Sequence, residues 1–231
     1  HFLTFLLMVG NLTQSGAKLK RIFIEPKLPE GLAPLAELSQ NIWWCWNHEA
    51  TELFQSIDPQ QFIALHNNPV ALLDELSIER AQELLDDKDF VARMKRVHKS
   101  FRDYIDKAPK PAGPQIGYFC MEYGLHQSLR LYSGGLGVLA GDYLKEISDR
   151  NANFVAVGLL YRYGYFQQGI SNNGEQLHNY EPVKFTQLPL QPVRDARGEW
   201  VKIQVNLSGR TVWAKVWQLP VGRMPLYLLD T

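Results

Sequence analysis

The chain has 231 residues, of which 45% are hydrophobic and 12% aromatic, and its 24 Lys and Arg residues balance 24 Asp and Glu residues. This composition excludes a disordered chain, and it lacks the basic excess of nucleic-acid-binding proteins. The cysteines are Cys45 and Cys120, without CxxC spacing, which excludes a disulfide framework and a zinc motif. We therefore expect reduced thiols, no bound metal and a cytoplasmic location.

The first 26 residues contain an apolar run from Phe2 to Val9. The run is far shorter than the roughly 20 residues of a membrane span. No basic segment precedes it and no small-residue cleavage site follows it, so a signal peptide is not indicated. We expect residues 1–26 to be a tag-like or poorly defined segment and the protein not to associate with a membrane.

Helical spacing dominates residues 27–108. Pro34 suits the first turn of a helix, and the apolar residues after it recur at helical spacing, namely Leu35, Leu38, Ile42, Trp43 and Trp46. Ser77 is expected to cap a later helix. The clearest stripe predicts one amphipathic helix over about residues 88–106, with Phe90, Met94, Val97, Phe101 and Ile105 on its apolar face.

Residues 109–114 contain three prolines and one glycine in the run Pro-Lys-Pro-Ala-Gly-Pro. Such a run predicts a stiff linker and a domain boundary. We expect the regions on its two sides to be separate packing units.

Beyond the linker, the pattern predicts an α/β fold. Two buried strands, at residues 116–121 and 154–161, flank a helix and make a βαβ unit. The apolar face of this helix is expected to carry Leu136, Leu139, Ala140, Leu144 and Ile147. Alternation at residues 201–207 and 212–219 around the Ser208-Gly209 turn predicts an antiparallel region. The apolar strand at residues 226–231 has no covering helix after it, so we expect the chain to stop partway through its fold.

The sharpest motif is Ser133-Gly134-Gly135-Leu136-Gly137, at the start of the predicted helix. Adjacent glycines let backbone N–H groups approach an anion, and a helix N-terminus adds partial positive charge. The motif therefore predicts phosphate or phosphosugar binding. A tight loop that merely needs positive φ explains it equally well. Gly141, within the helix, predicts close backbone packing.

Familiar phosphate motifs do not fit. The run from Gly135 to Ala140 matches GxGxxG/A, but it does not follow its strand directly, and Tyr161-Arg162 replaces the acidic residue expected after the second strand. Strings of the P-loop, HExxH and GxSxG kinds are absent from the sequence.

Residues 115–168, from Gln-Ile-Gly-Tyr-Phe-Cys-Met-Glu through the glycine motif to Tyr-Arg-Tyr-Gly-Tyr-Phe-Gln-Gln, closely resemble the α-glucan (glycogen and maltodextrin) phosphorylases. The segments 28–32, 41–47, 209–212 and 225–231 fit the same family. The resemblance covers about residues 27–231. It is to the bacterial and archaeal branch, which carries an extra helical region at its N-terminus.

The resemblance implies the glycosyltransferase B fold, with two Rossmann-like domains around a cleft. Residues 27–108 would be the helical N-terminal region. Residues 115–231 would be the first part of the N-terminal Rossmann-like domain, with an added antiparallel β region. The implied reaction is phosphorolysis of α-1,4-glucan or maltodextrin by inorganic phosphate, which yields glucose 1-phosphate.

The implied cofactor is pyridoxal 5′-phosphate, whose phosphate acts as acid–base partner of the substrate phosphate. The resemblance places its lysine in the C-terminal half of the family, outside this chain. The fragment alone is therefore expected to be inactive and free of cofactor. Homo-oligomerisation of the full-length enzyme is left open.

The resemblance also assigns site residues. Gly134, Gly135 and Leu136 match the loop that contacts the glucosyl and phosphate groups. Glu122 matches an acidic residue near the catalytic pocket and is the catalytic candidate, the alternative being a polar strand end facing water.

Four further residues are candidates for the cleft or an interface. His126, Tyr161 and Arg162 are candidate cleft residues, with interdomain packing as the alternative for the last two. Asp142 and Lys145 are explained by a surface pair. Trp44 lies off the apolar stripe and is the tryptophan to test for a glucan or interdomain contact.

Two other functions stay open. Starch and glycogen synthases also carry Gly-Gly-Leu-Gly, but they place Lys two residues before the glycine pair, where this chain has Tyr132. A non-catalytic carbohydrate-binding fragment is the second alternative.

Overall fold

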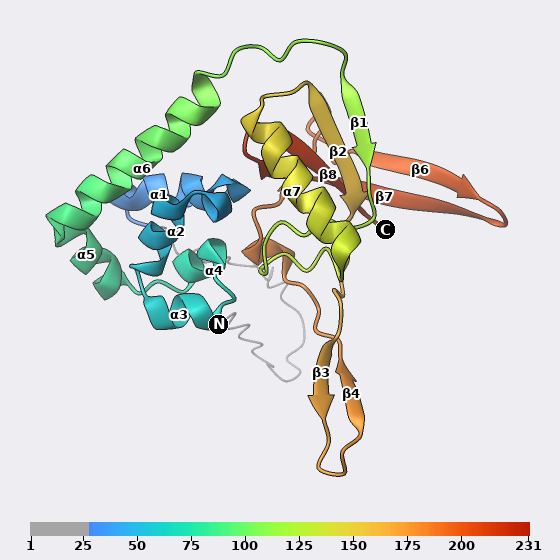
Figure 1. Ribbon diagram of the computed structural model, residues 1–231, viewed down its shortest axis with the longest axis horizontal. Coiled ribbons are helices and arrows are strands. Elements are labelled where there is room, and N and C mark those ends of the chain that lie inside the picture. Colours follow the sequence, from blue (N-terminus) through green and yellow to red (C-terminus); the bar gives the residue numbers. More distant parts are fainter. Residues whose placement is uncertain (1–27) are drawn as a thin grey trace, which may run out of the picture.

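A computed structural model describes residues 28–231, so the tag-like segment expected at residues 1–26 lies outside the described residues. The described chain forms a cluster of helices, a mixed six-stranded sheet with one helix against it, and a separate two-stranded hairpin (Figure 1). Within this part of the chain, no helix is long and apolar enough to cross a membrane.

The helical region confirms the helical spacing of the sequence. Its elements are η1 (Glu30–Leu32), α1 (Ala33–Ser39), η2 (Ile42–Trp46), α2 (His48–Gln55), α3 (Pro59–Ala64), α4 (Pro69–Asp74), α5 (Ile78–Asp86) and α6 (Lys88–Asp106). Polar side chains cap α2, α3, α4, α5 and α6 at their N-termini, as with Ser77, which accepts a hydrogen bond from the Arg80 N–H. The predicted amphipathic helix is α6, which buries Phe90, Met94, Val97 and Phe101.

The first apolar stripe does not continue as one helix. α1 ends at Ser39, and Asn41 caps the 3₁₀-helix η2 by accepting a hydrogen bond from the Trp43 N–H. Because a 3₁₀-helix has about three residues per turn, it turns Trp44 inward and leaves Trp46 half-buried. The prediction for Trp46 was therefore only partly correct, and Trp44, expected off the core, is 1% exposed.

The predicted βαβ unit is present. β1 (Ile116–Phe119), α7 (Gly135–Asp149) and β2 (Phe154–Leu159) follow in order, and β1 pairs with β2 in parallel. β8 (Met224–Asp230) extends the parallel part, and β7 (Arg210–Val221) pairs with β8 in antiparallel orientation. The sheet order is β1-β2-β8-β7-β5, where β5 is Gln191–Pro192. This mixed sheet with helices confirms the α/β class.

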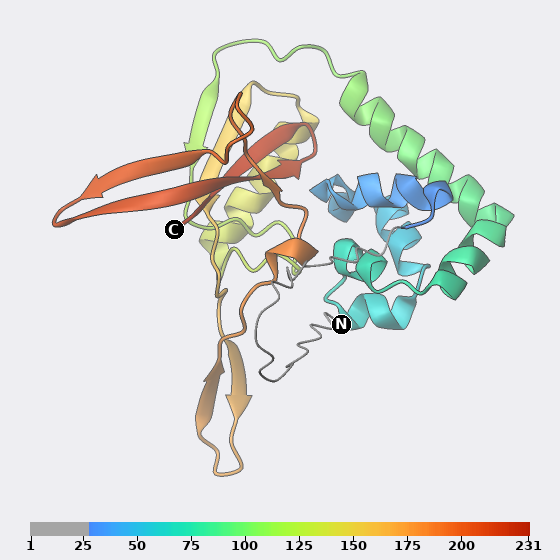
Figure 2. The same ribbon diagram turned by 180° about the vertical axis from the view of Figure 1, so that it is seen from behind.

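The antiparallel region predicted near the Ser208-Gly209 turn is the hairpin of β6 (Lys202–Leu207) and β7. A second hairpin, of β3 (Gln167–Ile170) and β4 (Gln176–Asn179), stands apart from the sheet. Seen from behind, the two hairpins project from the body in different directions (Figure 2). The 3₁₀-helix η3 (Phe185–Gln187) lies between β4 and β5 in the chain.

β1 differs from its prediction as a buried strand. It lies at the edge of the sheet, and the exposed fraction of Phe119 is 78%. β2 is buried as predicted on one face, because it lies between β1 and β8. An apolar run alone does not tell an inner strand from an edge strand, since both are rich in the same residues.

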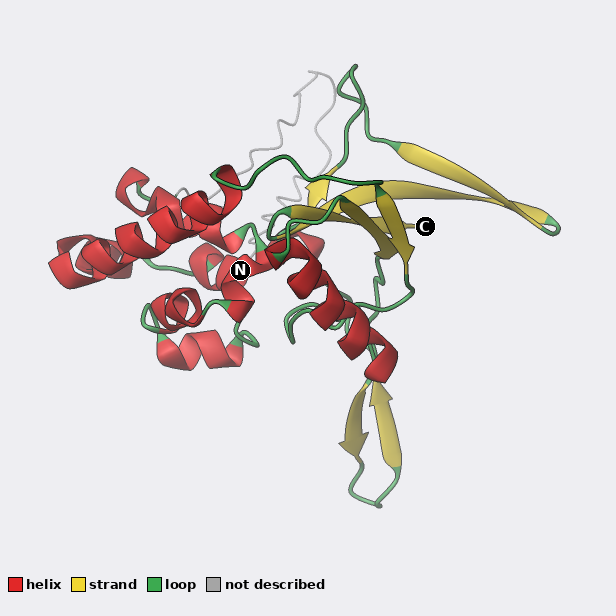
Figure 3. Cartoon of the chain, turned by 45° about the horizontal axis from the view of Figure 1, so that its top comes forward, coloured by secondary structure: helices red, strands yellow, loops and turns green. Residues whose placement is uncertain are grey.

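The two regions joined by residues 109–114 share one core, so the expectation of separate packing units was wrong. Buried side chains of both regions form a single cluster, which includes Leu38, Met94, Leu144 and Leu226. The helices lie to one side of the sheet (Figure 3), and the connection from α6 to β1 arches over the top of the molecule in the view of Figure 1. Cys45 and Cys120 are unpaired, as expected.

Candidate functional site

The glycine motif lies between β1 and α7, at the start of the helix. α7 begins at Gly135, directly after Gly134, and the loop that precedes it follows the carboxyl end of β1. Glu122 follows β1, and Tyr161 follows β2. Ligands of open α/β sheets bind at this edge, beyond the carboxyl ends of the parallel strands.

Neither glycine of the pair is required by its backbone conformation. Gly134 is extended, with φ −152° and ψ −157°, and neither Gly134 nor Gly135 is among the glycines with positive φ. A Cβ added at either position would meet no atom within 4 Å. A tight loop that needs positive φ is therefore not the reason for the pair. The pair leaves the backbone at this point open to the approach of another group.

Two backbone donors at this point are free within the described chain. The N–H groups of Gly135 and Leu136 lie in the first turn of α7, where no acceptor of the same helix can reach them. Among the backbone hydrogen bonds of residues 28–231, neither group has an acceptor. The helix dipole adds partial positive charge to them, so the pair can hold an anionic oxygen.

Glu122 is attached to the glycine motif through Ser133. One carboxylate oxygen accepts the Ser133 hydroxyl at 2.9 Å, and the other accepts the Ser133 N–H at 3.3 Å. These hydrogen bonds, with weaker ones from the Gly134 and Gly137 N–H groups, hold the pKa of Glu122 below its ordinary value. Glu122 is thus an anion that braces the loop. Its hydrogen bonds with Ser133 lie at the protein surface.

The back of the motif is closely packed. The Gly124 N–H donates to the Gly137 carbonyl at 2.7 Å. A Cβ on Gly137 would lie 2.3 Å from the Cβ of Tyr132, and one on Gly141 would lie 2.2 Å from the Gly124 oxygen. The prediction of close backbone packing at Gly141 is confirmed. The glycines of this segment therefore divide into two that pack and two that face open space.

Tyr161 lies beside the segment that follows β1, whereas Arg162 packs against another part of the chain. The Tyr161 hydroxyl donates to the Met121 carbonyl at 2.9 Å, and burial, with a smaller effect of Glu122, raises the pKa of this hydroxyl. The Arg162 guanidinium lies over the Phe185 ring at 5.4 Å. This is the packing alternative, not a contact with the glycine motif.

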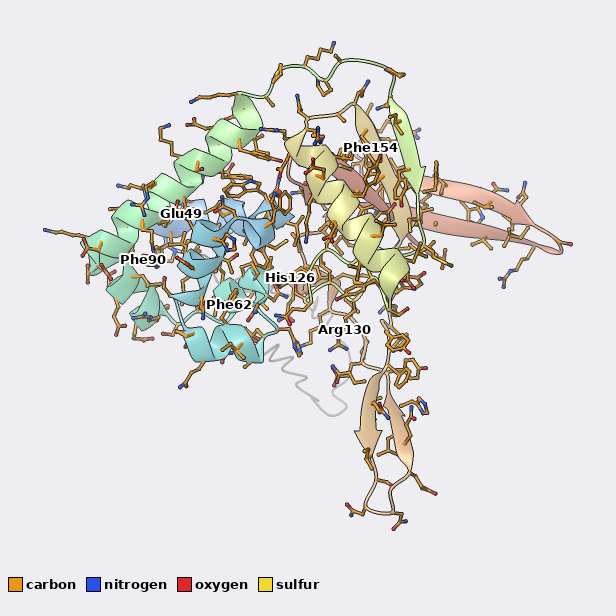
Figure 4. All side chains as sticks on the ribbon, viewed as in Figure 1. Glu49, Phe62, Phe90, His126, Arg130 and Phe154 are labelled. Atoms are coloured by element: carbon orange, nitrogen blue, oxygen red, sulfur yellow. The ribbon has the colours of Figure 1, made fainter. Side chains whose placement is uncertain are left out.

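His126 faces the helical region. Its Nδ1 accepts the Ser128 N–H at 3.2 Å, which leaves the ring proton on Nε2, and its ring meets that of Trp44 edge-on at 4.7 Å. Burial, with the nearby charge of Lys145, lowers the pKa of His126 to about 4, so the ring is neutral at pH 7. Figure 4 shows His126 beside the helices. Trp44 thus makes the interdomain contact, not a glucan platform.

Asp142 and Lys145 form the expected pair on α7, with 3.9 Å between their charged atoms.

Ser133 was not predicted to take part in the site by itself. Its hydroxyl stands directly before the glycine pair, and an acidic residue follows the preceding strand, so the sequence contained a usable signal for the hydrogen bond between them. Groups of His, Cys, Asp and Glu that could hold a metal do not occur in residues 28–231.

Comparison with known proteins gives three informative relatives. The chain is 41% identical over 216 residues to the maltodextrin phosphorylase of Thermococcus litoralis, an alignment of 90% of this chain and 26% of that protein. It is 37% identical over 226 residues to the glycogen phosphorylase of Mycobacterium tuberculosis, covering 92% of this chain and 26% of the relative. For the glycogen phosphorylase of Aquifex aeolicus the identity is 38%, covering 90% and 30%.

Residues 28–129 match a family described as a protein of unknown function, DUF3417. The match covers the helical region, the linker, β1 and part of the loop that follows β1. The chain spans about a quarter of the length of the first two relatives.

Proposed function

The chain is a relative of the α-glucan phosphorylases, and we propose that it is the N-terminal part of such an enzyme. The enzyme would transfer a glucosyl unit from the end of an α-1,4-glucan or maltodextrin to inorganic phosphate, giving glucose 1-phosphate. The proposal includes the glycosyltransferase B fold and a cytoplasmic location. The observation that supports it most is the glycine motif, which follows β1 in the chain and has no atom within 4 Å of a Cβ built at Gly134 or Gly135.

The proposed chemistry needs fixed donors for a phosphate dianion beside a glucosyl group. The free N–H groups of Gly135 and Leu136 can supply them, because no Cβ at Gly134 or Gly135 blocks the approach. Donors held by a helix need no reorganisation when charge develops in the transition state. The Glu122 carboxylate is engaged by Ser133, and these two N–H groups remain for the ligand.

Two cavities among residues 28–231 have volumes of about 280 Å³ each, one near Gln115, Phe154 and Met224 and the other near Arg80 and Arg93. Neither is lined by a lysine, with which pyridoxal 5′-phosphate forms a Schiff base, so neither fits the cofactor. The first lies at the start of β1, β2 and β8, the opposite end from the glycine motif. We propose that the cofactor, which would supply an acid–base phosphate, binds to a part of the enzyme outside this chain.

Exposed apolar side chains near the glycine motif favour a larger enzyme, in which another part of the protein covers them. Phe119 and Met121, at or just after the end of β1, are more than half exposed. Leu136 and Leu139 are also more than half exposed, so their predicted place on the buried face of α7 was wrong, whereas Ala140 and Leu144 are buried as predicted. Exposed large apolar groups are typical of an interface. We propose that the remaining part of the enzyme covers this surface and completes the cleft.

The test uses the full-length gene product, incubated with maltodextrin, inorganic phosphate and pyridoxal 5′-phosphate. We expect release of glucose 1-phosphate, and neither release nor cofactor absorbance from the 231-residue chain alone. Phosphorolysis by the isolated chain would overturn the assignment of the cofactor to another part. Glucan extension from a nucleotide sugar, without phosphorolysis, would favour a synthase, and binding of glucan without either reaction would favour a non-catalytic module.

A further inference from the structure

The segment Asn41–Trp46, which we term the tryptophan segment, connects the helical region to the sheet at several points. It comprises the cap residue Asn41 and the 3₁₀-helix η2. Trp43 and Trp44 are 4% and 1% exposed, so neither offers a ring to a sugar. Because both rings are buried, the segment acts through its contacts within the protein.

The first contact is between Asn41 and the turn that joins β7 to β8. The Asn41 amide donates to the Gly222 carbonyl at 2.9 Å and accepts the Gly222 N–H at 2.8 Å. Gly222 has φ +59°, and a Cβ there would lie 2.2 Å from the Ser148 hydroxyl, so only glycine suits the position. The side-chain amide of Asn41 therefore binds this turn twice, as a donor through its nitrogen and as an acceptor through its oxygen.

The same turn is attached to the last turn of α7. The Arg223 N–H donates to the Ser148 hydroxyl at 2.9 Å, and the Arg223 guanidinium donates to the Asp149 carbonyl at 2.8 Å. The guanidinium also lies 3.7 Å from the centre of the Tyr104 ring. A cation at the carboxyl end of a helix is favourable for the helix dipole.

Side chains of the helical region reach this end of α7 directly. The Tyr104 hydroxyl lies 2.8 Å from the Ser148 hydroxyl and donates to the Asp149 carboxylate at 2.8 Å. The Trp46 indole N–H donates to the same carboxylate oxygen at 3.3 Å. Two elements of the helical region, η2 and α6, thus hold Asp149 at the end of α7.

The second group of contacts lies near the other end of α7. Trp44 packs against His126, and the Cys45 thiol donates to the Leu125 carbonyl at 3.6 Å. The residue before Leu125 is Gly124, whose N–H donates to Gly137 in the first turn of α7. The tryptophan segment therefore reaches both ends of the helix that begins at the glycine motif.

From these contacts we propose that the helical region is a positioning device for α7 and its glycine motif, and that Asn41 and Tyr104 are positioning residues for phosphorolysis. The catalytic part of this inference rests on the proposed function, whereas the mechanical part does not. A helix is stiff along its axis, and the helical region contacts the segments at both ends of α7. Displacement of a reacting group by about 1 Å can cost roughly a hundredfold in rate, so these contacts matter for turnover.

The experiment compares Asn41→Ala with Asn68→Ala in the full-length protein. Asn68 is a matched control, since both residues are 8% exposed and both cap a helix. Asn68 also donates across the same interface, to the Gln187 carbonyl at 2.8 Å, but its contact is with η3 and not with the turn that holds α7. Hydrogen exchange is measured by mass spectrometry in peptides that cover residues 133–149.

We expect Asn41→Ala to raise exchange in these peptides by about tenfold or more at temperatures where the fold persists, and Asn68→Ala to leave them near the wild-type rate. Tyr104→Phe, which keeps the ring beneath Arg223, should raise exchange at the end of α7 even if Asn41→Ala does not fold. In phosphorolysis, kcat should fall by about tenfold for Asn41→Ala while the KM for glucan stays unchanged.

Equal exchange in Asn41→Ala and Asn68→Ala at matched stability, or wild-type exchange in Tyr104→Phe, would overturn the positioning role. Altered exchange with an unchanged kcat would overturn its catalytic part. If the wild-type protein does not carry out phosphorolysis, the proposed function fails, yet the exchange comparison still decides whether the helical region holds α7.

Discussion

The carboxylate of Glu122 accepts a hydrogen bond from the hydroxyl of Ser133 at 2.9 Å, and this bond ties the segment after β1 to the loop at the start of α7. The two residues are 11 positions apart, and the intervening chain forms the loop behind the glycine motif. A negative charge at the N-terminus of a helix is favourable, so the pair stabilises the loop electrostatically as well as geometrically.

Glu122→Gln should make the stability of the protein depend less on pH at acidic pH. The hydrogen bonds from Ser133 hold the pKa of Glu122 below its ordinary value of 4.5. A carboxylate with a lowered folded pKa contributes stability above its unfolded pKa and loses it as the pH falls through the folded pKa. We expect the melting temperatures of wild type and Glu122→Gln to differ at pH 7 and to converge toward pH 3. Parallel curves over this range would show that Ser133 does not stabilise the anion.

Gly135→Ala should lower turnover without lowering stability, whereas Gly141→Ala should lower stability. A Cβ at Gly135 meets open space, so this variant should fold with an unchanged melting temperature, yet misplace the groups that approach the loop. Alanine keeps the backbone N–H, so the expected loss comes from blocked access to it. Losing the use of a preorganised donor typically costs about 3 kcal/mol, or roughly a hundredfold in turnover. Full turnover in Gly135→Ala, or a loss that follows unfolding, would assign the loop a purely structural role.

In Gly141→Ala the new Cβ would lie 2.2 Å from the Gly124 oxygen. Overpacking of this kind costs about 1–3 kcal/mol. We therefore expect a lower melting temperature by calorimetry, with the fall in activity following the fall in folded protein. A stable Gly141→Ala variant would show that α7 can move away from Gly124 at little cost.

His126→Asn should remove a loss of stability at mildly acidic pH. The pKa of His126 is lowered to about 4 by burial, against about 6.5 in an unfolded chain. A histidine with a lowered folded pKa loses stability as the pH falls from the unfolded to the folded pKa, here by up to about 3 kcal/mol between pH 6.5 and 4. Asparagine keeps an acceptor for the Ser128 N–H but does not titrate. Urea unfolding at pH 7 and pH 5 measures the difference, and an identical pH dependence in the variant would contradict the buried neutral ring.

The linker should be cleaved without separating the two regions. Residues 109–114 are exposed and without regular structure. Limited proteolysis should cut between residues 107 and 114, and the two fragments should co-elute in size-exclusion chromatography, because Asn41, Tyr104 and the shared core hold them together. Fragments that elute separately would restore the view of two independent packing units.

The sequence alone determined the elements whose signals are local. The spacing from Phe90 to Ile105 predicts α6, and Ser77 predicts a helix start, because a helical periodicity and a cap depend on residues within one or two turns. The βαβ order follows from the change of period after the linker. The glycine motif and Gly141 were also visible, since glycine has few physical reasons to occur at a helix start or within a helix.

The tertiary structure decided what depends on residues far apart in the chain. The position of β1 at the sheet edge, and the exposure of Phe119 that follows, depend on which strands pair, and the strand's own composition carries no such information. The burial of Trp44 depends on His126, 82 positions later. The joint core of the two regions arises because burying apolar area is non-directional, so a proline-rich linker separates elements in the chain without separating them in space.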